Sequence, residues 1–282
     1  MRLGLLYALL RTEEKMLLKA AEDRSVTVEK LNAAQMSYEL DRCEQLPPVD
    51  VVLERCVSHS RALYALRFFK SYGIPCVNTF EVAEIAGDKA LTSLAFADHK
   101  VPTPRTIVAF SPEQALAALD TIGYPAVMKP VTGSWARLLA KVENVQQAES
   151  IIEHKSVLGH YLHSIFYIQE YVDKPGRDLR TFVVGDECIA GITRASEHWI
   201  TNTARGGRAE ALKVTDEIAD LSVRAANAVG GGVIAADLME RPDGSLTCHE
   251  VNYTMEFRNS VGPTGVDIPG RIIEYAIAQA RR

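Results

Sequence analysis

The feature that most constrains the fold is a pair of strand-like runs near the C-terminus, VIAADLME and SLTCHEVN, which are separated by a short polar segment. An Asp-Gly pair between two such runs is a strong signal for a two-residue hairpin loop. If Asp243–Gly244 forms this loop and the pairing is regular, Asp237 lies directly opposite Glu250. Carboxylates that face each other across an antiparallel pair repel, so the sequence predicts a compensating group at this point.

A bound cation is one such compensating group. Side chains alternate along a strand, which puts Glu250, Asn252 and Thr254 on one face and His249 on the other. Together with Asp237, the first two supply two carboxylates and an amide, an all-oxygen set that suits Mg²⁺. Alternatively, the carboxylates are solvated on the outer face of the hairpin. The run VIAAD argues against that reading, because it is apolar on both faces and so is typical of a covered sheet.

The first eighty or so residues predict a small parallel sheet. The runs LGLLYALL, EEKMLLKAAEDR, VDVVLERC, SRALYALRFFKSYG and IPCVN read as strand, helix, strand, helix and strand. This order indicates a Rossmann-like half-domain. No G-x-G-x-x-G motif occurs in it, so a dinucleotide site there is unsupported.

The rest of the chain predicts mixed α+β structure. A helix through GDKALTSLAFADH is followed by one that starts with Ser111 as N-cap, Pro112 at the first helical position and Gln114 in the capping box. Further helices are expected at about 145–154 and 216–228 and at the C-terminal RIIEYAIAQARR. We divide the chain into an N-terminal domain, a central lobe and a C-terminal lobe, at residues 1–85, 86–167 and 168–282.

Composition excludes several classes of function. A formal net charge of -5 gives no global attraction for nucleic acid or an acidic membrane. The five cysteines contain no C-x-x-C pair, which favours reduced thiols and an intracellular protein. The apolar patch in MRLGLLYALLRTEEK is too short to cross a bilayer, so we expect a first strand there and a cytoplasmic location.

A magnesium site of this kind usually shares its ion with substrate phosphates. Lys129 ends the apolar strand AVMK, and the loop VTGSWAR after it could place backbone N–H groups and Arg137 around phosphate oxygens. Lys89 stands at the start of a predicted helix, and the N-terminus of a helix favours the binding of an anion. The Walker A and protein-kinase motifs are absent, and each lysine taken alone is more often a surface charge.

Taken in order, these pieces resemble the ATP-grasp superfamily over nearly the whole chain. The matching pieces are Lys89, Lys129, the GSWAR loop, QEYV, DLR, Arg194, TNTARGG, Asp237 and HEVN. The strings ERCVSHSRA, QEYVDKPGRD, HWITNTARGG and NYTMEFRNS are most similar to the RimK-like branch and, within it, to the LysX family. The resemblance implies an N-terminal Rossmann-like (pre-ATP-grasp) domain and two α+β lobes that enclose ATP.

The resemblance also implies roles for individual residues. Asp237, Glu250 and Asn252 would hold Mg²⁺, while Arg194, Asn202 and Lys129 would act on the reacting groups. The residues that would bind ATP are Lys89, Lys129, Gly133, Ser134, Trp135, Ala136, Arg137, Gln169, Glu170, Tyr171, Val172, Asp178, Arg180 and Asn202. Two positions depart from the expected pattern, because Ala136 replaces a loop glycine and Ala195 replaces a second arginine.

The implied reaction forms an amide through an acyl phosphate. In the LysX family the acid is the C-terminal glutamate side chain of a small acidic LysW-type amino-group carrier protein, and the amine is 2-aminoadipate. Asn259 and Ser260 match the pair associated with aminoadipate selection, and Thr254 and Arg194 complete the expected specificity set. Without the resemblance, FRNS reads as a strand end with turn-forming residues.

The carrier is expected to meet the N-terminal domain after the run VDVVLERC. Arg55, Ser58 and Arg61 stand at the C-terminal end of that strand, where ligand sites of α/β sheets gather, although surface arginines are common. The resemblance further implies a homo-oligomer, a dimer or a tetramer. Open alternatives are a RimK-like or ArgX-like ligase that uses glutamate, a kinase acting on an alcohol, and a non-catalytic ATP-binding regulatory module.

Overall fold

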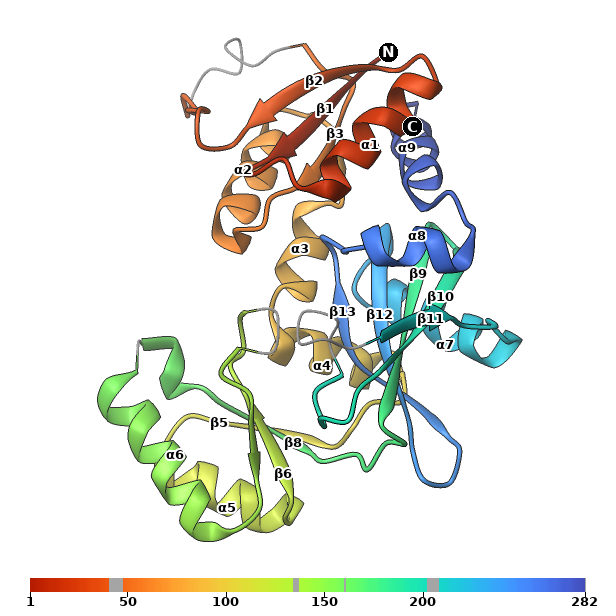
Figure 1. Cartoon of the computed structure of the whole chain (residues 1–282). Coiled ribbons are helices and arrows are strands. Elements are labelled where there is room, and N and C mark those ends of the chain that lie inside the picture. Colours follow the sequence, from red (N-terminus) through yellow and green to blue (C-terminus); the bar gives the residue numbers. More distant parts are fainter. Residues whose placement is uncertain (41–47, 134–136, 160, 202–207, 282) are drawn as a thin grey trace.

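The computed structural model describes residues 1–40, 48–133, 137–159, 161–201 and 208–281. Over these residues the chain forms three sheets, which follow one another from top to bottom in Figure 1 with the C-terminal sheet between the other two at its centre. Helices accompany each sheet, so the mixed α/β and α+β architecture predicted from the sequence is confirmed. Within the described residues, no helix is long and apolar enough to cross a membrane.

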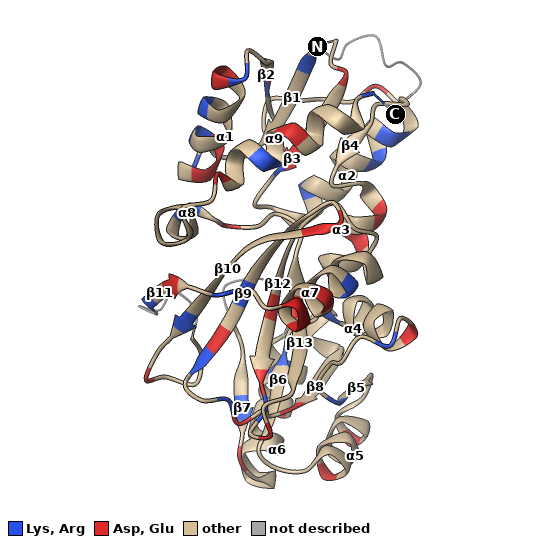
Figure 2. Cartoon of the chain, turned by 90° about the vertical axis from the view of Figure 1, so that its right-hand side faces the viewer, with Lys and Arg blue, Asp and Glu red and all other residues tan. Residues whose placement is uncertain are grey.

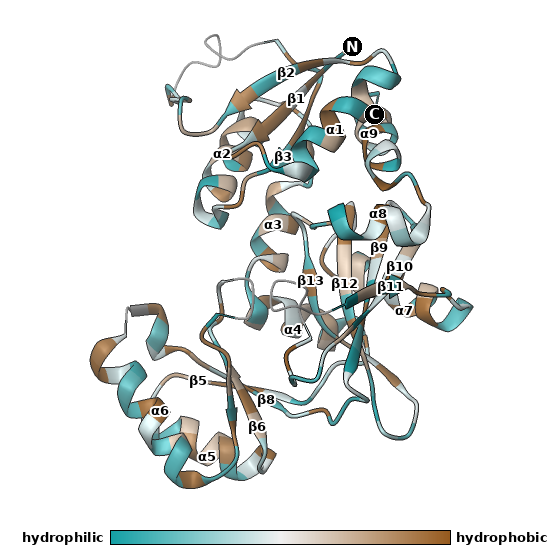
Figure 3. Ribbon diagram, viewed as in Figure 1, coloured by the Kyte–Doolittle hydropathy of each residue, from teal (hydrophilic) through white to brown (hydrophobic). Residues whose placement is uncertain are grey.

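The N-terminal sheet is parallel, as predicted, with strand order β2-β1-β3-β4. Its core strands β1 and β3 appear in brown in Figure 3, in line with their buried apolar side chains. The elements of this part are β1 Arg2–Tyr7, α1 Thr12–Asp23, β2 Thr27–Asn32, β3 Val51–Arg55, α2 His59–Ser71 and β4 Cys76–Val77.

Two features of this domain were not foreseen. The edge strand β2 was missed because Leu31 is its only buried residue, which leaves no apolar run in the sequence. The last helix, α9 Ile268–Gln279, returns from the far end of the chain to lie beside α1 (Figure 1). Its Ile272 and Ile273 share a buried core with Leu3 and Leu17, so the two ends of the chain pack together.

The central sheet has the order β5-β8-β6-β7 and is antiparallel. The predicted start of α5 is confirmed, since the Ser111 hydroxyl accepts a hydrogen bond of 3.2 Å from the Gln114 backbone N–H. The predicted domain division after residue 167 falls inside β8. A boundary after Glu170 would keep that strand with its sheet. The elements are β5 Thr106–Ala109, α5 Pro112–Ile122, β6 Ala126–Lys129, β7 Ala140–Val142, α6 Val145–Leu158, the 3-10 turn Tyr161–Ser164 and β8 Phe166–Glu170.

The C-terminal sheet has the order β11-β10-β9-β12-β13, again antiparallel. Its strand β9 carries both basic and acidic residues in Figure 2. Both faces of β12 are buried against apolar clusters, as the run VIAAD predicted. The elements are α3 Phe80–Ala86, α4 Lys89–Asp98, β9 Arg177–Val184, β10 Glu187–Ala195, β11 Arg208–Ala211, α7 Asp216–Ala228, β12 Val233–Glu240, β13 Leu246–Asn252 and α8 Arg258–Thr264.

The turn of the β12–β13 hairpin differs from the prediction. Arg241 donates its backbone N–H to Ser245 over 2.9 Å, which leaves the three residues 242–244 in the loop instead of two. Gly244 takes the left-handed conformation with φ of 83° that such a three-residue loop requires. The predicted two-residue loop is therefore wrong.

A second irregularity compensates for the first. Asp237 pairs with Glu250 while Leu238 pairs with Cys248, so His249 is an extra residue on β13. Such a bulge shifts the register by one residue. The predicted Asp237–Glu250 pair is confirmed, because the one-residue shift from the longer loop and the one-residue shift from the bulge cancel.

Candidate functional site

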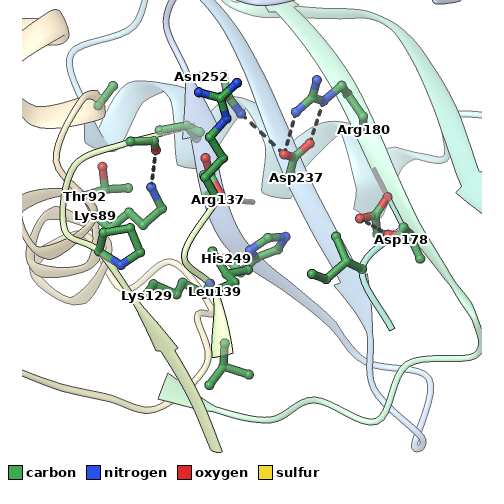
Figure 4. Close-up of a pocket in the computed structure, with 18 of the residues that line it drawn as sticks. Lys89, Thr92, Lys129, Arg137, Leu139, Asp178, Arg180, Asp237, His249 and Asn252 are labelled. Carbon is green, nitrogen blue, oxygen red and sulfur yellow. Dashed lines mark hydrogen bonds and ion pairs between the residues drawn. The ribbon is translucent and has the colours of Figure 1, made fainter. Parts of the chain in front are cut away.

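A cavity of about 370 Å³ is lined by residues of the central and C-terminal sheets and of segments that follow the strands of the N-terminal sheet. This volume lies within the usual range of about 300–1,000 Å³ for ligand pockets. The central lobe contributes Lys129 and Gln169, and the C-terminal sheet contributes Asp237 and Glu250. The N-terminal domain contributes Arg11 and, after β3, Cys56, Val57 and His59. Figure 4 shows part of this cavity.

Asp237 on β12 is held by cations. Arg180, on the neighbouring strand β9, donates two hydrogen bonds of 2.7 Å to its two carboxylate oxygens (Figure 4), and Arg194 Nη2 lies 3.1 Å from Oδ1. Burial by itself would raise the pKa of Asp237, but the two arginines outweigh it and hold that pKa far below its usual value. Asp237 is therefore ionised throughout the physiological range.

A second buried carboxylate orients Arg194. Asp178 accepts hydrogen bonds of 2.6 and 2.9 Å from Arg194 Nε and Nη2, and it also accepts one from the Thr201 hydroxyl. Lys174 donates to Thr201 over 2.8 Å and lies 3.5 Å from Asp178. Arg194 thus stands in one fixed orientation between Asp178 and Asp237.

The other two predicted metal ligands stand on β13 beside Asp237. Asn252 Nδ2 lies 3.4 Å from Asp237 Oδ2, which aims the amide at the carboxylate (Figure 4). Glu250 lines the cavity, and among the described residues its carboxylate has neither an ion pair nor a hydrogen bond. The structure therefore brings the predicted set together, with Glu250 as its unengaged member.

Lys129 ends β6 and is buried inside the cavity wall. Its ammonium donates to Gln169 Oε1 over 2.7 Å, and Gln169 Nε2 in turn donates to Thr106 and Tyr167. Burial lowers the pKa of Lys129 to about 8, and the negative charge of Glu250 limits the shift. An anion entering the cavity would favour the protonated form of this lysine.

The loop that follows β6 closes over the start of α4. Lys89 donates to the carbonyl of Gly133 over 2.7 Å, and Gly133, Arg137 and Leu139 all line the cavity. The predicted ligands Ser134, Trp135, Ala136 and Asn202 lie outside the described residues.

The predicted hinge lies at the end of β8. Gln169, Glu170, Tyr171 and Val172 all line the cavity. Glu170 also forms an ion pair with Arg241, which follows β12, so a side-chain contact joins the two lobes at the hinge.

His249 was missed because strict alternation put it on the opposite face of β13. The bulge brings it to the cavity wall, where both of its ring nitrogens are buried without a hydrogen-bond partner. Burial lowers the pKa of His249 to about 3, which keeps its imidazole neutral. A β-bulge within a hairpin has no clear sequence signature, so the position of His249 could not be predicted.

The residues expected to meet the carrier are not gathered on one surface. Arg55 is buried, with its Nε 3.1 Å from Glu14 Oε1 and its guanidinium over the Phe257 ring. Ser58 is half-buried and Arg61 is exposed, and neither lines the cavity. The accessible part of this predicted set is therefore Ser58 and Arg61.

The predicted specificity residues divide into two groups. Thr254 and Arg194 line the cavity, whereas Asn259 and Ser260 lie on α8 and do not. Asn259 is exposed, and Ser260 is buried. The segment FRNS thus enters a short helix, so its reading as a strand end with turn-forming residues is wrong.

Comparisons with known proteins match this architecture. A family model described as the LysX preATP-grasp domain matches residues 3–85, and one described as the RimK-like ATP-grasp domain matches residues 86–276. The chain is 36% identical over 264 residues to the alpha-aminoadipate–LysW ligase LysX of Sulfurisphaera tokodaii, covering 93% of each chain. It is 31% identical over 277 residues to the glutamate–LysW ligase ArgX of the same organism, covering 98% of each.

Solved structures agree in fold. A RimK domain ATP-grasp protein from Sphaerobacter thermophilus superposes with a TM-score of 0.84 at 25% identity, and the match covers 98% of this chain and 100% of that one. The ATP-grasp architecture expected from the sequence is thereby confirmed.

Proposed function

Since the chain belongs to the RimK-like ATP-grasp family and is an ATP-grasp ligase, we propose that it joins 2-aminoadipate to the C-terminal glutamate side chain of a LysW-type carrier protein. ATP would be the energy source, and the reaction would serve lysine biosynthesis. The observation that carries this proposal is a single cavity in which cations and carboxylates from both lobes face one another.

The reaction has two steps. A carboxylate oxygen of the carrier attacks the γ-phosphorus of ATP, so ADP leaves and an acyl phosphate forms. The amine nitrogen then attacks the acyl carbon, loses a proton, and displaces phosphate. Both steps require positioning and charge neutralisation more than covalent participation by the protein.

The residues of the cavity fit these tasks. Lys89 and Lys129 would bind phosphate oxygens, and residues 169–172 would contact the adenine at the hinge. Arg194, fixed by Asp178, would face the charge that develops at the γ-phosphate. We assign Asn202 to the same group, with Asp178 and Arg180 near the nucleotide.

The oxygen atoms at the hairpin fit a magnesium ion. Glu250 and the Asn252 side-chain carbonyl offer acceptors of the hard type that Mg²⁺ prefers, and Asp237 stands beside them. Asp237 already accepts two hydrogen bonds from Arg180 and pairs with Arg194, so a metal ion would have to share its carboxylate with these arginines. Bound Mg²⁺ would supply charge neutralisation at the phosphates.

The amino acid is the least constrained part of the proposal. The similarity to an aminoadipate ligase and to a glutamate ligase supports both substrates, and the higher identity favours 2-aminoadipate. Asn259 and Ser260 remain proposed specificity residues. Because they lie outside the cavity wall, they would act through Glu256 and Phe257, which precede α8.

The decisive experiment measures the intact mass of a LysW-type carrier after incubation with the enzyme, ATP and Mg²⁺. 2-Aminoadipate and glutamate are supplied separately, and ADP is measured in parallel. A mass gain of one aminoadipate residue with ADP release would support the proposal. A gain of glutamate would keep the mechanism and replace the substrate, whereas no gain with either would overturn the carrier ligase.

Three further parts of the proposal rest on the sequence alone. These are the cytoplasmic location, a homo-oligomer of two or four chains, and carrier contacts at Arg55, Ser58 and Arg61. For the last, only Ser58 and Arg61 offer accessible side chains. Exchange of Arg61 for Gln should raise the KM for an acidic carrier at low salt, because exposed charges mainly increase the rate at which two oppositely charged proteins associate.

A further inference from the structure

We infer that Arg11 binds a carboxylate of the amino acid that supplies the amine, an inference that rests on the proposed function. Arg11 comes to the cavity from the N-terminal domain, just before α1, whereas the hinge at residues 169–172 comes from the central lobe. ATP bound at the hinge and phosphates at Lys129 leave the part of the cavity at Arg11 for the other substrates.

A row of side chains runs from the proposed magnesium site to Arg11. Asn252, Thr254 and Glu256 are alternate residues of one segment, and all three line the cavity. The row begins at the proposed magnesium ligands and ends at Arg11, whose Nη1 lies 3.4 Å from Glu256 Oε1. A substrate at Arg11 would therefore share one cavity wall with the proposed magnesium ligands.

Glu14 holds the guanidinium of Arg11 in one orientation. Glu14, which is fully buried, accepts hydrogen bonds of 3.0 Å from Arg11 Nε and 2.7 Å from Nη2, and a third of 2.9 Å from the Arg11 backbone N–H. Arg55 Nε also donates to Glu14 over 3.1 Å, which holds the carboxylate in place. A planar cation whose far edge is anchored in this way loses little entropy when it binds a ligand.

Arg11 lines the cavity, and its Nη1 is the nitrogen of the guanidinium that Glu14 does not bind. Within the described chain, Nη1 makes one contact, the long one to Glu256. Guanidinium is well matched to carboxylate. An amino acid carries a carboxylate that this guanidinium can bind, whereas an amine without a carboxylate offers it no such partner.

The competing explanation is that Arg11 only begins α1. It occupies the N-cap position of that helix and shares a capping box with Glu14. A purely structural arginine would affect the melting temperature and all amines alike. A carboxylate-binding arginine would affect amines that carry a carboxylate more than those that do not.

The test therefore compares amines in the carrier-dependent release of ADP. The enzyme is assayed with the amino acid, with its α-amide and side-chain amide, and with hydroxylamine, which carries no carboxylate. The variants are Arg11→Gln, Arg11→Lys and the control Arg24→Gln, which removes a charge from the other end of α1, where Arg24 pairs with Glu274.

For Arg11→Gln we expect kcat/KM for the amino acid to fall about 10- to 100-fold more than for hydroxylamine, the range for a charge-assisted hydrogen bond. The preference of the wild type for the acid over one of its amides should collapse by a similar factor. The KM for ATP should change less than about twofold in each variant. Arg11→Lys should recover part of the loss, and Arg24→Gln should match the wild type.

Equal losses with all amines, or an unchanged preference for acid over both amides, would overturn the inference. If Arg11→Gln fails to fold, the same comparison is made with Arg11→Lys, which keeps the charge and loses the planar fork. A wild-type enzyme that releases no ADP with any amine would instead overturn the proposed function, so the two failures are distinguishable.

Discussion

Arg180 and Asp237 stand opposite each other on neighbouring strands and pair through two hydrogen bonds of 2.7 Å. Both side chains are largely buried, with exposed fractions of 15% and 5%. The two hydrogen bonds fix the Asp237 carboxylate at the hairpin. A second cation, Arg194, lies beside that carboxylate. Asp237 thus has a structural role as well as the proposed role at the metal, whereas Glu250 has no partner among the described residues.

Exchange of Asp237 for Asn should therefore lower both stability and activity. The change leaves the buried Arg180 without its paired carboxylate and removes one of the two carboxylates beside Arg194, which costs on the order of 3 kcal/mol. Chemical unfolding measures this loss, and the Mg²⁺ concentration that gives half-maximal ADP release should rise at least about tenfold. An unaltered free energy of unfolding would show that the two arginines find another anion.

Exchange of Glu250 for Gln should separate the two effects. The carboxylate has no partner among the described residues, so the free energy of unfolding should change by less than about 1 kcal/mol. Mg²⁺-dependent ADP release should nevertheless be abolished, because a hard cation loses a charged oxygen ligand. Turnover close to that of the wild type would remove Glu250 from the metal set.

The buried Lys129 should give nucleotide binding a pH dependence. Its pKa in the free protein is about 8, because burial disfavours the ammonium, and only that form attracts phosphate. As pH rises above about 8, the affinity for ATP should fall by up to tenfold per pH unit. Titration calorimetry between pH 7 and pH 10 measures the slope.

The matched control is Lys129→Arg, whose guanidinium remains charged over this range. Its ATP affinity should lack the decline above pH 8, and an identical decline in both proteins would assign it to another group. Without nucleotide, the folded state releases the Lys129 proton near pH 8 and the unfolded chain near 10.5. The contribution of Lys129 to the free energy of unfolding should therefore rise with pH between these values.

The sequence predicts that the β12–β13 hairpin forms, but not the length of its loop or the position of its bulge. Asp-Gly and two apolar runs predict two antiparallel strands, and the burial of β12 on both faces follows from VIAAD. The three-residue loop and the bulge at His249 are each one-residue changes that leave no compositional mark. They cancel at Asp237 and Glu250, so the pair is predicted correctly while His249 is placed on the wrong face.

Charged residues in the N-terminal domain show a second limit of prediction from the sequence. A sequence pattern places Arg55 at the end of a strand and suggests a surface cation. The structure buries it against Glu14, which lies about forty positions earlier in the chain. Pairing between distant charges is what allows both to be buried. Such pairing depends on tertiary contacts, so the cluster of Arg11, Glu14 and Arg55 was not foreseen.

Glu54 supplies the last prediction. It is fully buried at the end of β3, accepts a hydrogen bond of 2.8 Å from the Thr254 hydroxyl, and also accepts one from the Cys56 backbone N–H. Burial raises its pKa to about 7 from 4.5. The folded state then binds one more proton than the unfolded chain between these values, so the free energy of unfolding should fall as pH rises from about 4.5 to 7.

The exchange Glu54→Gln should remove this dependence, because the amide stays neutral at every pH. The variant should gain stability relative to the wild type as pH rises from 4.5 to 8, by up to about 3 kcal/mol. Urea unfolding at several pH values measures the difference. The control Glu153→Gln makes the same change of charge on an exposed position of α6 and should run parallel to the wild type. A constant difference between Glu54→Gln and the wild type would mean that folding does not raise the pKa of Glu54.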